Sequence, residues 1–223
     1  MRSLGYNQCV RHTTTRYIVL AAIFTAIGIL LPHYFHLFGE VGKMFSPMHI
    51  PVLLCGFVCG RRYGAICGAI TPALSWLITG GSMPPVFLLL PMIFELTAYG
   101  FVAGLAIKLL KPVYVKLIQR TSGKNTLAVR WLYCIAVLVV AMLVGRVVYG
   151  LAVWTFFPLI KPPPGFPTDN LFKWILTALF VDTLAGMLLQ IVFVPIVLLT
   201  LQEAKQIDIF SIREKNAETV SEC

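Results

Sequence analysis

Charged residues are scarce in this sequence. Asp, Glu, Lys and Arg make up only 12% of its 223 residues, whereas a water-soluble domain carries about 25%. Hydrophobic residues make up 58%, mean hydropathy is +0.85, and the apolar residues form long runs. No polar stretch is long enough to bury a core of its own. We therefore exclude a separate soluble domain and expect residues 1–223 to form a single integral membrane domain.

Several enzyme motifs are also missing. The phosphate-loop motif G-x-x-x-x-G-K-[ST] is absent. The nearest match is SGKN at 122–125, which lacks the first glycine and the final Ser or Thr. HExxH and GxSxG are absent, and the six cysteines contain no CxxC pair and no spacing typical of a disulfide framework. The polar start, MRSLGYNQCVRHTTTRY, gives no sign of a cleavable signal peptide. We expect a protein that is not an enzyme and that holds no cofactor of its own.

The sequence does contain six apolar segments of helical length, which predict an all-α bundle of six transmembrane helices. The second segment is the shortest and covers only about 21 Å, so it needs shielding by its neighbours. The six helices are expected at roughly residues 16–32, 47–60, 63–80, 85–110, 128–157 and 170–200.

Lysine and arginine are distributed unevenly between the two sides of this bundle. Of the 18 such residues, only Lys43, Lys161 and Lys173 fall on the side opposite the two chain ends, and only Arg146 lies within a span. Because positive charge accumulates on the cytoplasmic side, we expect both termini in the cytoplasm of a multi-pass protein of the bacterial plasma membrane. The net charge of +9 follows from this topology, so we expect no nucleic-acid partner.

Glycine recurs at every fourth position around the turn between the second and third helices. Small residues let helix backbones approach closely, so we expect a tight helical hairpin with Arg61 and Arg62 in its cytoplasmic turn. Cys55 and Cys59 share a helical face near His49, but an apolar-helix cysteine usually fills space, and packing is preferred over a metal site. The four glycines are Gly56, Gly60, Gly64 and Gly68.

Three ionisable residues lie deep in the predicted spans, namely Glu95, Arg146 and Asp182. Each is costly in a membrane unless it is paired or hydrated, so each is a functional candidate. Counting residues from the outer helix ends puts all three about 15–18 Å below the outer surface. Two interpretations stay open: a structural cluster in which Arg146 bridges the two acids, or a polar pocket in which Arg146 holds an anionic group.

Other polar residues gather in the predicted outer half. His49 opens the second helix, and Ser75 and Trp76 lie in the last turns of the third, so we add all three to the candidate substrate-binding residues. The aromatic segment 33–46, HYFHLFGEVGKMFS, is too long for a minimal turn. It is either an interfacial anchor or a lid over the pocket.

The order of these features resembles the substrate-binding (S) components of energy-coupling factor, or ECF, transporters. The series begins with HIPVLLCGFVCG and continues through YG, TPALS, TG, PP, PM, Glu95 and a second YG. The resemblance covers nearly the whole chain and is strongest over 45–110. It implies a subunit that binds a vitamin or related micronutrient on the outer side. It also implies partners: a transmembrane coupling protein and two ATPases, which would hydrolyse the ATP.

The resemblance also assigns a role to two alanines. S components meet the coupling protein through an Ala-x-x-x-Ala pattern on the first helix, and Ala22 and Ala26 match it here. From the residues alone, ordinary helix packing is the preferred explanation, and docking is favoured only because of the resemblance. Two other functions remain as alternatives, namely a proton-coupled secondary carrier that titrates Glu95 or Asp182, and an intramembrane enzyme that uses this acid pair.

Overall fold

The computed structural model describes residues 2–36, 48–81, 84–120, 126–156 and 184–203. Within these ranges every regular element is a helix, as the all-α prediction required. The helices are α1 (Arg2–His36), α3 (His49–Cys59), α4 (Arg61–Ile78), α5 (Val86–Arg120), α6 (Thr126–Phe156) and α8 (Leu184–Glu203).

Two helices are longer than hydropathy predicted. α1 begins at Arg2 instead of residue 16, and α5 continues to Arg120 instead of ending near residue 110. A hydropathy pattern shows only where a helix stops being apolar in sequence. The helix itself continues until a capping or breaking signal ends its backbone hydrogen bonding. The polar extensions therefore escaped the prediction. Part of the last predicted helix, 170–183, lies outside the described residues.

Three of the described helices are long and apolar enough to cross a membrane: Thr14–Tyr34, Leu88–Arg120 and Leu127–Phe156. α3 has only 11 residues, or about 16 Å of helix, and every one of them except Val58 is buried. The shielding that its shortness requires is therefore present. α8 contributes a further short apolar stretch, Gly186–Gln202.

The glycines of α3 and α4 both pack against α5. A Cβ atom added to Gly56 would lie 2.6 Å from the Gly100 carbonyl oxygen, and one added to Gly64 would lie 2.5 Å from the same atom. One turn further along α4, a Cβ on Gly68 would overlap the Leu96 backbone. The predicted hairpin thus exists, but its small residues also admit a third helix. The three backbones meet more closely than any larger side chain would allow.

The turn between α3 and α4 depends on Gly60. Its φ of 84° lies in the left-handed region, where a residue without Cβ is favoured. Its backbone N–H donates to the Gly56 carbonyl and so completes α3. Arg61 and Arg62 follow immediately and are both exposed.

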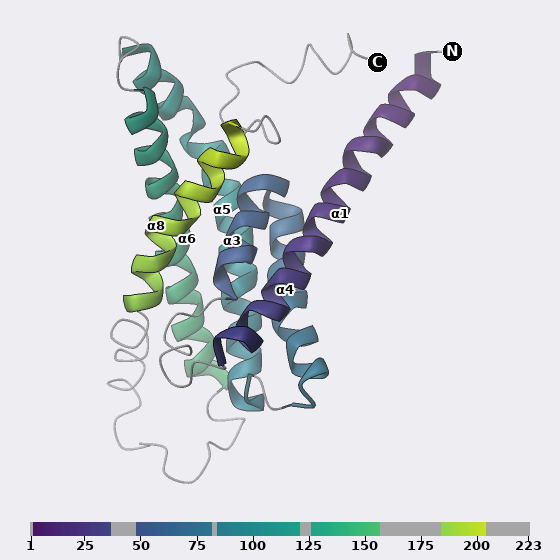
Figure 1. Ribbon diagram of the computed structural model, residues 1–223, viewed down its shortest axis with the longest axis vertical. Coiled ribbons are helices and arrows are strands. Elements are labelled where there is room, and N and C mark those ends of the chain that lie inside the picture. Colours follow the sequence, from purple (N-terminus) through teal and green to yellow (C-terminus); the bar gives the residue numbers. More distant parts are fainter. Residues whose placement is uncertain (1, 37–47, 82–83, 121–125, 157–183, 204–223) are drawn as a thin grey trace.

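The arrangement of the helices is uneven. α3, α4 and α5 form the centre, with α1 on one side and α6 and α8 on the other (Figure 1). α1 packs on α3 and α4, whereas α6 packs along the length of α5. The start of α1, the end of α5 and the end of α8 lie at the same end of the bundle (Figure 1). The predicted topology also has these three helix ends on one side, and which side of the membrane that is stays a prediction.

Candidate functional site

Glu95 is the centre of a buried polar cluster. Its side chain projects from the apolar helix α5, and the residue is only 2% exposed. Arg146 of α6 reaches it from the neighbouring helix, with Nη1 3.1 Å from Oε1. Tyr99, one turn further along α5, donates its hydroxyl to the same oxygen at 3.0 Å. One carboxylate oxygen therefore accepts from two helices.

His49 brings a third helix to this cluster. It is the first residue of α3, and its Nε2 lies 3.7 Å from Glu95 Oε2. Its ring also meets the Tyr99 ring edge-on, with the ring centres 5.2 Å apart and an interplanar angle of 69°. His49 and Tyr99 thus contact each other as well as the acid. The cluster joins α3, α5 and α6 at one level of the bundle.

Glycines beside the cluster make this approach possible. Gly145 directly precedes Arg146, and a Cβ atom added to it would overlap the Tyr99 ring. Gly68 packs against the backbone of Leu96, the neighbour of Glu95 in the chain. Two backbones are therefore drawn toward α5 at the turn that carries the acid. The cluster therefore depends on these glycines, which let the helices approach, as well as on its charged residues.

The cluster leaves one polar group without a partner. Arg146 is 6% exposed, and its Nε forms no hydrogen bond with any described residue. A guanidinium carries five donors in a fixed fork, and here Nη1 supplies the ion pair. A buried charge pair is seldom more stable than apolar residues of the same volume. Its presence inside a membrane helix pair therefore favours a functional role over a purely structural one.

The structure brings together three of the predicted site residues, Glu95, Arg146 and His49. Ser75 and Trp76 lie further along α4: Gly68 lies opposite Leu96, and Ser75 is about 10 Å beyond Gly68 along the helix. Ser75 is fully buried, and Trp76 Nε1 has no partner among the described residues.

Asp182 lies outside the described residues, as does most of the 33–46 segment. The sequence prediction also missed Tyr99. The signal was available, because Tyr99 follows Glu95 by four residues and the two therefore share one helix face.

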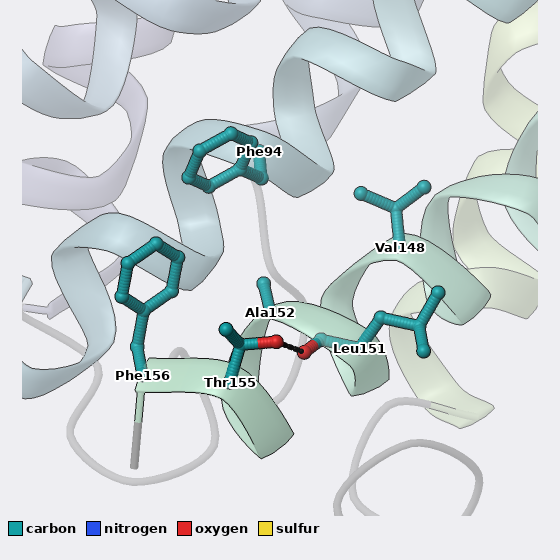
Figure 2. A pocket seen from close by; sticks show the side chains of 6 residues that line it. All are labelled: Phe94, Val148, Leu151, Ala152, Thr155 and Phe156. Carbon is teal, nitrogen blue, oxygen red and sulfur yellow. Dashed lines mark hydrogen bonds between the residues drawn. The ribbon is translucent and has the colours of Figure 1, made fainter. Parts of the chain in front are cut away.

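A shallow hollow lies between the first turns of α5 and the last turns of α6. Its volume is about 240 Å³, and the Phe94 and Phe156 rings stack at its edge with centres 5.6 Å apart. The Thr155 hydroxyl is turned to the Leu151 carbonyl, so the hollow is apolar (Figure 2). Phe94 precedes Glu95 and points about 100° away around the helix. The hollow therefore lies on another face of α5 than the buried acid.

The cysteines belong to the hydrophobic core. Cys55, Cys59 and Cys67 are all buried there, in the reduced form. The Thr25 hydroxyl of α1 donates to Cys67 Sγ at 3.3 Å, which ties α1 to α4. Among the described residues, no group of three His, Cys, Asp or Glu side chains is arranged to hold a metal ion.

A second surface lies between α1 and α4. It is a groove of about 570 Å³, and both Ala22 and Ala26 are exposed along it. Thr25, between them, is partly buried by its bond to Cys67. Because alanine side chains are so short, this face of α1 is low and smooth. The groove is lined by Ile18, Ala21, Ala22, Thr25, Ala26, Ile29, Tyr63, Ile66, Cys67, Ile70 and Leu74.

Comparison with known protein families identifies the chain. Residues 16–198 match the family described as the ECF transporter, substrate-specific component. The match extends over most of the chain, so the protein belongs to this family of membrane transporter subunits, as its sequence motifs predicted. No curated protein and no solved structure matches it in the same comparisons.

Proposed function

We propose that this protein is the high-affinity substrate-binding subunit of an ECF-type importer in the bacterial plasma membrane. It would cross the membrane six times, with both termini in the cytoplasm, and bind a vitamin or related micronutrient from the outside. The observation that carries the proposal is the buried cluster of Glu95, Arg146 and His49, because no other group of described residues holds charge inside the bundle. Family membership supplies the transport role.

Substrate recognition would rest on Arg146. Glu95, which is itself held by the Tyr99 hydroxyl, fixes one edge of the guanidinium, and Nε lies at a buried position without a partner among the described residues. A carboxylate or phosphate of the substrate is the natural acceptor for such a group. Glu95 Oε2 and His49, 3.7 Å apart, would receive a polar N–H or O–H of the same molecule. Burial makes each of these contacts selective, since a substrate that lacks one leaves a buried group unpaired.

Energy would come from partner subunits. The exposed alanine face of α1 and the groove beside it form a smooth surface on which a coupling protein could pack its own helix. Two ATPases bound to that protein would hydrolyse ATP, a step for which this chain has no phosphate loop. Co-expression with such a module tests this part of the proposal. Stable co-purification is the expected result, and its failure would remove the docking role.

The first experiment is a thermal-stability screen of the purified full chain against vitamins and their precursors. A substrate at 100 times its Kd stabilises the folded state by about 2.7 kcal/mol, which is readily measured. Arg146→Ala should abolish the shift for the substrate found, whereas Arg62→Ala, which changes an exposed arginine of the α3–α4 turn, should preserve it. If Arg146→Ala folds well and binds with unchanged affinity, Arg146 has a structural role only.

One observation favours a different function. Glu95 and His49 are two titratable side chains, both buried and 3.7 Å apart, and such a pair could carry a proton for a secondary carrier. The two functions differ in their need for partners. Uptake by cells that lack every ECF ATPase, abolished by Glu95→Gln, would establish the carrier. Uptake that requires the ATPases would establish the S component.

A further inference from the structure

The last turns of α5 form a strongly basic segment. Within residues 108–120 the helix carries Lys108, Lys111, Lys116 and Arg120 and no acidic residue. The sequence has no Asp or Glu at all between Glu95 and Asp169, so neither α6 nor the α5–α6 connection supplies a neutralising charge. This is the longest stretch of the chain without a carboxylate among its basic residues.

These four side chains point away from the bundle. All four are exposed, and none forms an ion pair with a described residue. The helix is held from its other face, where Tyr114 is 4% exposed and packs on Tyr133 of α6, with ring centres 4.7 Å apart and the rings tilted by 39°. Arg130 differs from the four, because it shares a hydrogen bond with the Tyr114 side chain. Within the described part of the chain, these four cations are therefore a surface feature and not part of the packing between α5 and α6.

Apolar side chains are interleaved with these cations. Leu109 is 65% exposed, Val113 58% and Leu117 40%. They follow one another at intervals of four residues and so lie on one face of the helix. Lys116 and Arg120 lie on this face toward the end of α5, whereas Lys108 and Lys111 lie on the far side of the helix, so the cations occupy two sides of it. Cations and exposed apolar residues thus alternate along the last turns of α5.

The length of α5 places this change at a membrane surface. The helix has 35 residues and is about 52 Å long, whereas the hydrocarbon core of a bilayer is about 30 Å thick. Its last turns must therefore leave the core. On the topology proposed above, on which this step rests, they emerge at the cytoplasmic leaflet, where anionic phospholipids attract Lys and Arg. Lysine stems can run along the acyl chains while the ammonium groups reach the phosphates.

We propose that Lys108, Lys111, Lys116 and Arg120 form a binding site for the headgroups of anionic phospholipids. Leu109, the exposed apolar residue of this segment nearest to the hydrocarbon core, would contact the acyl chains of the same lipids. An acidic protein surface would meet one side of the helix, whereas these exposed cations lie on two sides of it, so a surrounding lipid headgroup layer fits the arrangement better. Such a site would hold the cytoplasmic end of α5 at the membrane surface. Glu95 lies near the other end of the same helix.

The test measures lipid selectivity of the full chain in phosphatidylcholine membranes. Trace amounts of spin-labelled phosphatidylglycerol and phosphatidylcholine report the relative association of each lipid with the protein. We expect wild type to prefer phosphatidylglycerol several-fold, and 1 M NaCl, which shortens the Debye length to about 3 Å, to remove most of the preference. The triple variant Lys108→Gln/Lys111→Gln/Lys116→Gln should lose it at low salt.

The matched control is Arg61→Gln/Arg62→Gln, which removes exposed charge from the α3–α4 turn and should keep the preference. An equal loss in both variants would overturn the site, because selectivity would then follow total charge. A wild-type protein without any preference, or one that is insensitive to salt, would overturn it as well.

A triple variant that keeps its lipid preference but fails to co-purify with the ECF module would assign these lysines to a protein partner. Substrate-induced stabilisation, measured on the same samples, reports the proposed function separately. A protein that binds substrate but shows no lipid preference refutes only the lipid site.

Discussion

α1 and α5 are both long apolar helices, but they are built for different surroundings. In the apolar window of α5, 39% of the residues are buried inside the protein, against 11% in the window of α1. α5 contacts α3, α4 and α6 and carries the buried acid, whereas α1 touches only α3 and α4 extensively. α5 therefore organises the interior of this subunit. α1 offers most of its surface to something outside it, either lipid or a partner.

The small residues of the central helices and of α1 also differ in how far they are covered by other helices. On the central helices, Gly56, Gly64 and Gly100 are covered, and their missing side chains are occupied by neighbouring backbone. On α1, Ala22 and Ala26 are exposed, and nothing in the described part of the chain covers them. Small residues in membrane helices allow close helix contact. In α5 that contact is made with α3 and α4, whereas the face of α1 that carries Ala22 and Ala26 is open among the described residues.

The largest effect is expected from Gly100→Leu. A Cβ atom at this position would overlap the Gly64 carbonyl, so a leucine must push α4 away from α5. Overpacking of this kind costs about 3 kcal/mol or more, because backbone cannot move aside as a side chain can. The thermal unfolding midpoint of the purified variant should fall by many degrees, or the protein should fail to accumulate in a folded state.

Ala26→Leu is the matched control for this prediction. It adds a larger side chain to an equally small residue, but on the exposed face of α1. We expect an unfolding midpoint close to that of wild type. If Gly100→Leu and Ala26→Leu were equally unstable, the conclusion that Gly100 lies on a filled helix face and Ala26 on an open one would be wrong.

A smaller but still large effect is expected when the ion pair is broken. Glu95→Gln leaves Arg146 buried with its charge uncompensated, which costs about 3 kcal/mol in a low-dielectric interior. Arg146→Gln should cost a similar amount, and the double variant should cost clearly less than the two added together. Unfolding midpoints of all three proteins, measured without substrate, give this coupling. Strict additivity would mean that the two charges do not interact, contrary to their 3.1 Å contact.

Tyr99→Phe should have a modest effect. The substitution keeps the ring that packs edge-on against His49 and removes only the hydroxyl that donates to Glu95. Loss of one hydrogen bond to a charged group destabilises by about 1.5 to 3 kcal/mol. Tyr133→Phe is the control, because its hydroxyl donates to the Ile107 carbonyl, away from the cluster. Both variants should lose stability, but only Tyr99→Phe should also weaken substrate binding.

The sequence predicted the parts of this site that depend on position within one helix. Counting residues from the helix ends put Glu95 and Arg146 at the same depth, and the structure joins them by an ion pair. Contacts between helices were harder to foresee. The spacing of Gly56 and Gly64 does not predict that both contact Gly100. The register between helices depends on how their side chains pack, and sequence periodicity does not determine it.

Helix length was also predicted only in part. The polar beginning of α1 and the basic end of α5 lack the apolar periodicity by which membrane helices are detected, so both extensions were missed. Tyr99 was overlooked for another reason. An aromatic residue on a buried helix face is usually a packing residue, and only the 3.0 Å distance between its hydroxyl and Glu95 Oε1 shows that it donates a hydrogen bond. The family, by contrast, was predictable, because its motifs lie in order along the chain.

The last prediction concerns the open face of α1 and should leave stability unchanged. Ala22→Trp places a large ring in the groove between α1 and α4 without touching the central glycines. Unfolding and substrate binding should both match wild type, since the polar cluster lies on α3, α5 and α6. Association with the coupling protein, measured by co-purification of the ECF module, should be lost, because a bulky side chain prevents close helix contact. Undiminished co-purification would show that this face meets lipid, and the difference between α1 and α5 would then reflect only their place in the bundle.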